Sequence, residues 1–231
     1  MAPSTPAVGT LSGISLFRGV STRKLERLAP LMHERIFPVG TNILTAGQPG
    51  ETVYVLLRGS VKVHLFTANG TEVILAVLGP GELLGEMSAA DSLGRSADVV
   101  TLEVTTFLWI DRRTFRSSVE ESSVLALNLA EILSKRVRLT NARLLSMATL
   151  DVPGRVAAQV TTLAREYGEE IQEGVRIPIR LTQSDLAALV GASRVRVNQA
   201  LGFFRKRGLI SIDRGGHVIV HDQDALAQRA R

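Results

Sequence analysis

A group of side chains on one predicted helix, directly after Ser193, has the types and spacing needed to read the edges of DNA bases. Val197, Leu201 and Phe204 recur at helical spacing and are expected to pack inward. The side chains left outward near the start of this helix are Arg194, Val195, Asn198 and Gln199. Groups of this kind at the N-terminal end of a helix can reach base edges in the major groove. The alternative is an ordinary pair of helices with a solvated basic face.

A second group, between residues 85 and 97, could bind a phosphodiester sugar. Gly85-Glu86-Met87-Ser88 is followed by a short polar insert and then by Arg95-Ser96-Ala97. A guanidinium opposes the phosphate charge, hydroxyl and backbone N–H groups donate to phosphate oxygens, and a carboxylate accepts from a ribose hydroxyl. Taken alone, these residues are explained more simply by a surface loop that contains a Glu–Arg pair.

The first group is positioned by two predicted helices joined by a tight turn. Thr182 can cap the first helix, with Asp185 three residues later closing a capping box. Gly191 permits the left-handed turn that ends this helix, and Ser193 can cap the second. This order predicts a helix-turn-helix.

The second group lies within a region of short strands, from about Arg35 to Trp109. Glycine-marked turns, including the hairpin signal Asn69-Gly70, separate its apolar clusters. Regular short strands of this kind predict an antiparallel barrel or sandwich. The clusters are Ile43–Leu44, Val53–Leu57, Val61–Leu65, Val73–Leu78, Val99–Leu102 and Phe107–Ile110.

Residues 117–150 contain no Gly or Pro and predict one long helix. A stripe alternates in steps of four and three along it, which is typical of the seam of a two-stranded coiled coil. Its members are Ala126, Ala130, Leu133, Val137, Thr140, Leu144 and Met147. The sequence therefore favours a homodimer, although the stripe could instead pack on its own barrel. The hydroxyl of Thr140 should have a partner, either across the dimer or in a ligand.

A predicted hinge, formed by Asp151, Pro153 and Gly154, ends the long helix. A helix over residues 155–167, a strand over 175–181, the helix-turn-helix and a hairpin around 213–216 follow, with a short helix from Asp222. The predicted fold class is α+β, with a barrel domain (1–116), a dimerisation helix (117–150) and a winged helix-turn-helix domain (151–231).

The charge of the chain is uneven. Its formal net charge is +5, and its isoelectric point is about 10.2. Residues 1–154 carry 15 basic and 14 acidic residues, a difference of +1, whereas residues 155–231 carry 12 and 8, a difference of +4. The basic excess therefore accompanies the helix-turn-helix, as a surface facing phosphates requires.

Several classes of protein are excluded or disfavoured. The chain has no cysteine, which excludes disulfides, thiolate-bound zinc, a cysteine nucleophile and a cysteine-held iron–sulfur cluster. No apolar run approaches the roughly 18 residues of a membrane span. The first ten residues do not resemble a signal peptide and are expected to be a flexible lead-in. We expect a cytoplasmic protein with no membrane partner and no metal site.

Barrel, long helix, hinge and winged helix, in this order, resemble the bacterial cyclic-AMP receptor (catabolite activator)/FNR family of transcription regulators. The resemblance runs from about Leu16 to Val220. It is carried by Gly85-Glu86…Arg95-Ser96-Ala97, Leu139-Thr140-Asn141, Leu150-Asp151-Val152-Pro153-Gly154-Arg155 and Val190-Gly191-Ala192-Ser193-Arg194. It implies a jelly-roll, cyclic-nucleotide-binding barrel and a non-enzymatic homodimer that binds double-stranded DNA and RNA polymerase. It also implies no cofactor, with cyclic AMP as the allosteric effector.

The resemblance assigns roles to particular residues. Gly85 and Glu86 would contact the ribose, and Arg95 and Ser96 the cyclic phosphate. Thr140 would bond the adenine in its own subunit. Two further candidates complete the effector site: Asn141, which would reach the partner's ligand, and Arg136.

The implied DNA-binding set departs from the best-known member of the family. Val195 replaces a glutamate and Gln199 an arginine, while Arg194 is retained and would read guanine. We therefore expect a palindrome with an altered half-site. The set is Thr182, Ser184, Ser193, Arg194, Val195, Arg196, Asn198 and Gln199.

Other functions stay open at this point. The chain could respond to another effector, such as cyclic di-GMP or a redox ligand, or to none. A cyclic-nucleotide-regulated enzyme is least favoured, because the C-terminal segment is short and shows no nucleophile–base constellation. A purely architectural DNA-binding protein would not need the loop of residues 85–97.

Overall fold

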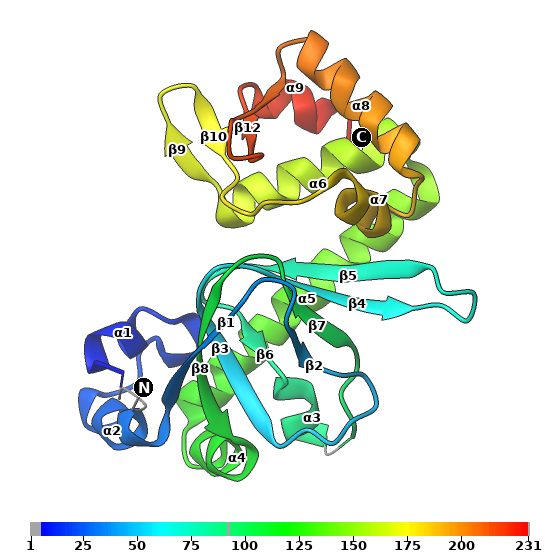
Figure 1. The fold of residues 1–231 in the computed structure, drawn as a ribbon. Helices are drawn as coiled ribbons and strands as arrows, with labels where there is room; N and C mark the ends of the chain where they lie inside the picture. The colour runs from blue at the N-terminus through cyan, green and yellow to red at the C-terminus, as the bar shows by residue number, and fades with distance from the viewer. Residues whose placement is uncertain (1–5, 92, 231) are drawn as a thin grey trace. The chain divides into compact units, whose positions relative to one another are not determined.

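The computed structural model describes residues 6–91 and 93–230 and is shown in Figure 1. The chain divides into two compact units. The N-terminal unit combines Met1–Leu65 with Ala76–Val137, and the C-terminal unit combines Phe66–Leu75 with Arg138–Arg231. The long helix contributes to both units.

Two four-stranded sheets form the region predicted to be a barrel, with the orders β1-β8-β3-β6 and β2-β7-β4-β5. The predicted antiparallel β fold is confirmed, as a jelly-roll-like pair of sheets. The strands are β1 (His33–Phe37), β2 (Asn42–Leu44), β3 (Thr52–Arg58), β4 (Val61–Phe66), β5 (Glu72–Leu78), β6 (Leu83–Leu84), β7 (Asp98–Thr101) and β8 (Thr105–Asp111).

Both faces of β3 are buried, which explains its nearly continuous apolar sequence. Tyr54 and Leu56 point into a core to which strands of both sheets contribute. Val53 and Val55 alternate with them and point to the opposite face, where they belong to a second core cluster. The first sheet is therefore covered on both sides.

Short helices near the N-terminus cover this second face. Leu11, Leu16 and Leu25 are each no more than 2% exposed and pack with strand residues such as Leu108. Figure 1 shows α1 and α2 beside the sheet that contains β1 and β8. The helices are α1 (Val8–Ser12), η1 (Ser15–Phe17), α2 (Thr22–Leu28) and η2 (Ala29–Leu31). The expectation of a flexible lead-in is wrong from Val8 onward, and its first five residues lie outside the described part of the chain.

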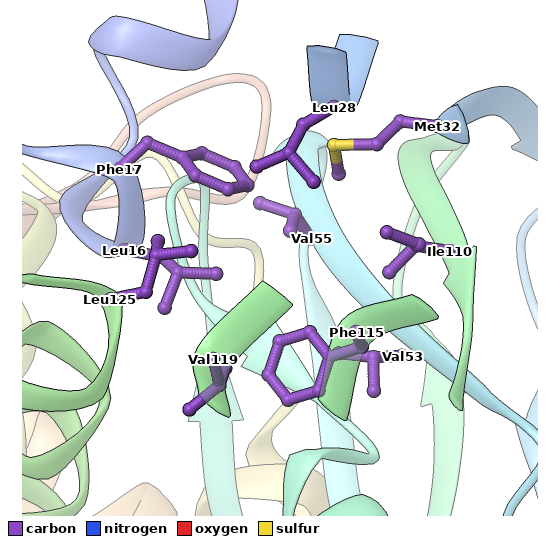
Figure 2. A pocket seen from close by; sticks show the side chains of 10 residues that line it. All are labelled: Leu16, Phe17, Leu28, Met32, Val53, Val55, Ile110, Phe115, Val119 and Leu125. Carbon is purple, nitrogen blue, oxygen red and sulfur yellow. The ribbon is translucent and has the colours of Figure 1, made fainter. Parts of the chain in front are cut away.

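A small cavity lies inside this second cluster. Figure 2 shows its lining, in which Phe17 and Leu28 of the N-terminal helices approach Val53, Val55 and Ile110 of the sheet. Its volume is about 10 Å³ and its lining is apolar. A space of this size is at the limit for one water molecule, so this cavity is a packing defect of the core and not a nucleotide site.

The predicted long helix is two helices, α4 (Arg112–Glu120) and α5 (Ser123–Thr149). The expectation of a continuous helix from residue 117 is therefore wrong at its start. The hydroxyl of Ser122 accepts from the backbone N–H of Leu125 at 3.5 Å, and Lys24 donates to the Glu121 carbonyl at 2.8 Å. Local serine bonding and an outside donor satisfy the backbone groups at the break without Gly or Pro.

The C-terminal unit contains the predicted winged helix-turn-helix. Its four-stranded sheet has the order β11-β12-β10-β9, and β11 and β12 form the expected wing. Its elements are α6 (Val152–Tyr167), β9 (Glu169–Ile171), β10 (Gly174–Arg176), α7 (Gln183–Val190), α8 (Arg194–Lys206), β11 (Ile210–Ile212), β12 (Val218–Val220) and α9 (Gln223–Gln228). The expected strand over 175–181 stops at Arg176, and β9 was not predicted.

Of the three predicted hinge residues, only Asp151 lies outside the helices in the structure. Asp151 is extended (φ −69°, ψ 173°) and caps α6, with its carboxylate accepting from the Gly154 N–H at 2.8 Å. Pro153 and Gly154 lie inside the first turn of α6, where the missing proline N–H is tolerated. The residue pushed to extended geometry is thus Asp151 and not Val152, which precedes the proline.

Among the described residues, no helix has the length and apolar character needed to cross a membrane.

Candidate functional site

Arg95 is the central cation of the loop of residues 85–97, which we call the effector loop. Its side chain is held between β3 and the turn that leads into α3 (Glu86–Asp91), and the residue is only 7% exposed. Its guanidinium donates to the Ser88 hydroxyl at 2.8 Å, the Gly85 carbonyl at 3.1 Å and the Thr52 carbonyl at 2.7 Å. These partners are neutral oxygens, so none of them cancels the positive charge.

Burial is the main influence on Arg95. It lowers the pKa of the guanidinium below its ordinary value, and nearby Tyr54, Glu86 and Glu51 act in the opposite direction. The side chain remains a cation, because an arginine pKa is far above neutral. A cation withdrawn from water in this way gains more from an anionic partner than an exposed one does.

Two glycines near Arg95, one in this loop and one just before β3, are too closely approached to accept a larger residue. Gly85 has φ +80°, and a Cβ there would lie 2.2 Å from an Arg95 nitrogen. A Cβ at Gly50 would lie 2.2 Å from the Ser88 hydroxyl oxygen. Glycine at both positions therefore allows Arg95 to be enclosed by backbone.

Glu86, the candidate ribose-binding carboxylate, is paired with the long helix. Its side chain is 3% exposed, and its Oε1 accepts from Nη1 of Arg136 at 2.5 Å. The other terminal nitrogen of Arg136 bonds Glu82 at 3.1 Å. Arg136, inferred only from the resemblance, is thus joined to the effector loop within the N-terminal unit.

Ser96 is exposed, and its hydroxyl contacts the Met87 sulfur at 3.8 Å. Thr140 and Asn141 are also exposed, about one helical turn beyond Arg136 on α5. They belong to the C-terminal unit, whereas the loop of residues 85–97 belongs to the N-terminal unit. The structure thus brings together Gly85, Glu86, Arg95 and Arg136, and it leaves the joining of Thr140 and Asn141 to this group as a prediction.

The predicted seam of α5 is largely uncovered within one chain. Val137 is 59% exposed, Leu144 67% and Met147 39%. Ala126 and Ala130 are exposed as well, and only Leu133 packs partly against the core. These exposures contradict the alternative that the whole stripe packs on its own barrel. The dimer itself stays a prediction.

The helix-turn-helix has the local structure that its sequence predicts. The Thr182 hydroxyl accepts from the Asp185 N–H at 3.0 Å, and the Asp185 carboxylate accepts from the Thr182 N–H at 3.1 Å. Gly191 is left-handed (φ 61°, ψ 49°), and the Ser193 hydroxyl accepts from the Arg196 N–H. The cap and turn residues thus fix where α8 begins.

One face of α8 is buried and the other is open. Val197 and Phe204 are fully buried and Leu201 is 5% exposed, as predicted. The candidate base-reading side chains lie on the open face, and Val195 is 66% exposed. The exposed candidates are Thr182, Ser184, Ser193, Arg194, Val195, Arg196, Asn198 and Gln199.

Several contacts around these groups were not foreseen. Arg155 of α6 donates to the Val190 carbonyl at 3.0 Å, at the end of α7. Gln183, the first residue of α7, donates to the Asn198 side chain at 2.9 Å. Thr52, which accepts from Arg95, and Glu82, which accepts from Arg136, were missed as contacts around the effector loop. Each of these pairs joins different elements, so no short-range sequence signal could reveal it.

The wing carries a further polar cluster. Asp213 accepts from Arg176 at 3.0 Å and from the His217 N–H at 2.8 Å. The His217 amide bond, followed by the Arg176 bond, holds the pKa of Asp213 well below its ordinary value. These bonds fix the base of the wing and leave Arg214 exposed at its tip.

Comparison with known proteins matches both units. Residues 34–122 match the model of the cyclic nucleotide-binding domain, and residues 154–229 match that of the Crp-like helix-turn-helix domain. The chain is 34% identical to the CRP-like cAMP-activated global transcriptional regulator of Mycobacterium tuberculosis, covering 96% of this chain and 98% of the relative. It is 30% identical to the cyclic AMP receptor protein of Thermus thermophilus, covering 89% and 92%.

A solved structure of a regulator that responds to a different effector is also similar. It is that of the c-di-GMP-responsive global regulator CLP of Xanthomonas campestris, with 26% identity, a TM-score of 0.70 and coverage of 87% of this chain and 100% of that one. The fold, the paired domain matches and the full-length relatives agree. This chain belongs to the cyclic-AMP receptor/FNR family of DNA-binding transcription regulators, which are not enzymes.

Proposed function

We propose that this chain is a cyclic-AMP-responsive transcription regulator that acts in the cytoplasm as a homodimer on a palindromic DNA site. The observation that carries the effector is the enclosed guanidinium of Arg95, which is 7% exposed and bonded to neutral oxygens. Burying a charge is unfavourable unless it is paired. A cyclic phosphate brings one delocalised negative charge, which this cation can neutralise.

The other effector residues take complementary roles. The exposed Ser96 hydroxyl donates to the phosphate. Arg136 holds Oε1 of Glu86, so Oε2 can accept from a ribose hydroxyl. Thr140 bonds the adenine, and Asn141 reaches the ligand of the second subunit.

The homodimer is formed along the open stripe of α5, where Val137, Leu144 and Met147 are exposed in the single chain. Burying apolar surface contributes about 25 cal/mol per Å², and an α-helix with such a stripe is stabilised by a partner. Cyclic AMP raises DNA affinity only to the extent that it binds the DNA-competent arrangement more tightly than the alternative. In that arrangement the two copies of α8 lie roughly 34 Å apart, one turn of DNA.

The DNA half-site differs from that of the best-known family member. Arg194 reads guanine, Val195 contacts a thymine methyl, and Gln199 favours adenine. Thr182, Ser184, Ser193 and Arg196 bond phosphates or the bases beside them. RNA polymerase is a further partner that membership of this family implies.

Calorimetric titration with cyclic AMP, cyclic GMP and cyclic di-GMP tests the effector. We expect one cyclic AMP per subunit and much weaker binding of cyclic GMP. Arg95→Gln should weaken cyclic AMP binding by about 10- to 100-fold, since hydrogen bonds to charged groups contribute about 1.5–3 kcal/mol. The matched control is Arg58→Gln, which removes the same charge from an exposed position of the same unit.

Two results would redirect the proposal. Binding of cyclic di-GMP alone would favour the effector to which the Xanthomonas regulator responds. Heat from none of the three ligands would leave a DNA-binding regulator without cyclic-nucleotide control.

A further inference from the structure

The two helices of the helix-turn-helix are joined by a hydrogen bond between side-chain amides. Nε2 of Gln183, at the start of α7, donates to Oδ1 of Asn198, in the second turn of α8, at 2.9 Å. Asn198 is exposed and Gln183 is half-buried. The bond therefore lies at the surface that the helix-turn-helix offers to DNA.

Asn198 shares a face of α8 with the base-reading candidates. An α-helix advances about 100° per residue, at 3.6 residues per turn. Seen down the axis from Arg194, Val195 is displaced by about 100°, Asn198 by about 40° and Gln199 by about 140°. Asn198 thus lies between Arg194 and Val195, about 100° around the helix from the buried Val197.

An asparagine amide has two different ends. Its oxygen only accepts hydrogen bonds, and its NH₂ group only donates them. Asparagine reads adenine by using both ends at once, whereas the other bases match only one of them. A partner that engages one end therefore decides which end remains for DNA.

We propose that Gln183 sets the hydrogen-bonding polarity of Asn198. Because Oδ1 of Asn198 is turned toward α7 to accept from Gln183, Nδ2 is presented to the groove as a donor. At the base facing Asn198, the protein then prefers a base edge with an acceptor, which guanine (N7 and O6), thymine (O4) and adenine (N7) present, to the cytosine edge, which presents only the N4 amino donor. Gln183 acts through Asn198 and is a positioning residue. This inference rests on the DNA-reading role proposed for α8.

Two substitutions of Gln183 separate the two polarities. Gln183→Lys supplies a group that only donates, so the orientation of Asn198 is kept. Gln183→Glu supplies a group that only accepts, so the amide of Asn198 must turn and present its oxygen to DNA. The two variants change the charge in opposite directions, but the ratio between bases at one position is measured within each protein, so a uniform effect on phosphate attraction cancels.

The experiment is a selection from a randomised half-site library, with and without saturating cyclic AMP, followed by affinity measurements on the enriched sites. The parent chain and Gln183→Lys should share a depletion of C relative to G and T at one position. Gln183→Glu should raise C relative to G and T at that position by about fivefold, the equivalent of one ordinary hydrogen bond. Asn198→Ala should lose the preference, and adding Gln183→Glu to it should then have no effect.

The outcomes distinguish this inference from the proposal beneath it. The same ratio of C to G and T at that position for the parent, Gln183→Lys and Gln183→Glu would overturn the role of Gln183 while leaving DNA reading intact. Failure of the parent chain to enrich any palindrome would instead overturn the DNA-reading role itself. Thermal unfolding of each variant checks that the capping box of Thr182 and Asp185 still holds α7.

Discussion

The ion pair between Arg136 and Glu86 should stabilise the N-terminal unit to a measurable extent. We consider Arg136→Met, which keeps the length and helix propensity of the side chain and removes its charge. The substitution leaves the carboxylates of Glu86 and Glu82, whose side chains are 3% and 16% exposed, without this cation. Both carboxylates belong to the same unit as the effector loop.

The magnitude follows from burial. Removing one partner of a fully buried ion pair destabilises a protein by about 3–5 kcal/mol. The side chain of Arg136 is 25% exposed, so water already screens part of the interaction, and we expect a loss of about 2–3 kcal/mol. Arg138→Met removes the same charge from an exposed position of α5 and should stay within about 0.5 kcal/mol of the parent.

Urea denaturation followed by tryptophan fluorescence measures this loss. The chain has one tryptophan, Trp109 on β8, so the signal reports the N-terminal unit. Adding Glu86→Gln to Arg136→Met should recover part of the loss, because an amide is less costly to leave unpaired than a carboxylate. An unfolding free energy for Arg136→Met equal to that of Arg138→Met would refute the reasoning.

Two further predictions concern the seam and the wing. Leu144→Glu, on the α5 stripe, should convert a dimer to a monomer in analytical ultracentrifugation, whereas Leu145→Glu, equally exposed but off the stripe, should not; a dimer in both would contradict the seam. The folded-state pKa of Asp213 is lowered by the His217 amide and by Arg176, so its stabilisation is complete above the ordinary value of 3.8 and is lost as the pH falls through the lowered folded value. Asp213→Asn should therefore lower the melting temperature near neutral pH and flatten its decline in acid, as followed by circular dichroism; an unchanged acid profile would contradict this assignment.

The helix-turn-helix could be predicted closely because its signals are local. Each signal satisfies or redirects backbone groups no more than four residues away. The residues concerned are Thr182 with Asp185, Gly191 and Ser193. Such bonds form whenever the helix forms, so residue type and spacing are sufficient.

The N-terminal helices and the break before α5 were missed for different reasons. Leu11 and Leu16 are buried only because a sheet from a later part of the sequence covers them. The break depends on Ser122 and on a donor from α2, Lys24, and serine is also tolerated inside helices. Tertiary contacts decided both features.

The effector loop was predicted in its residue types but not in its pairing. Glu86 and Arg95 look like a pair in the sequence, yet the close partner of Glu86 is Arg136, and Arg95 bonds Ser88 and the Thr52 carbonyl. Strand register and the placement of α5 determine these contacts, and neither can be read from residue spacing alone.

The start of α6 limits how far α5 can be extended as a continuous helix. If α5 continued through the junction, Pro153 would face the carbonyl of Thr149 without an N–H to offer, and its ring would clash there, at a cost of about 3 kcal/mol. A single continuous helix across this junction is therefore disfavoured. Leu150 alone separates the last residue of α5 from the cap of α6. The sequence thus places a short non-helical junction between α5 and α6. Few backbone dihedral angles are available there, so a conformational change in α5 reaches α6 as a change in the direction of the helix axis.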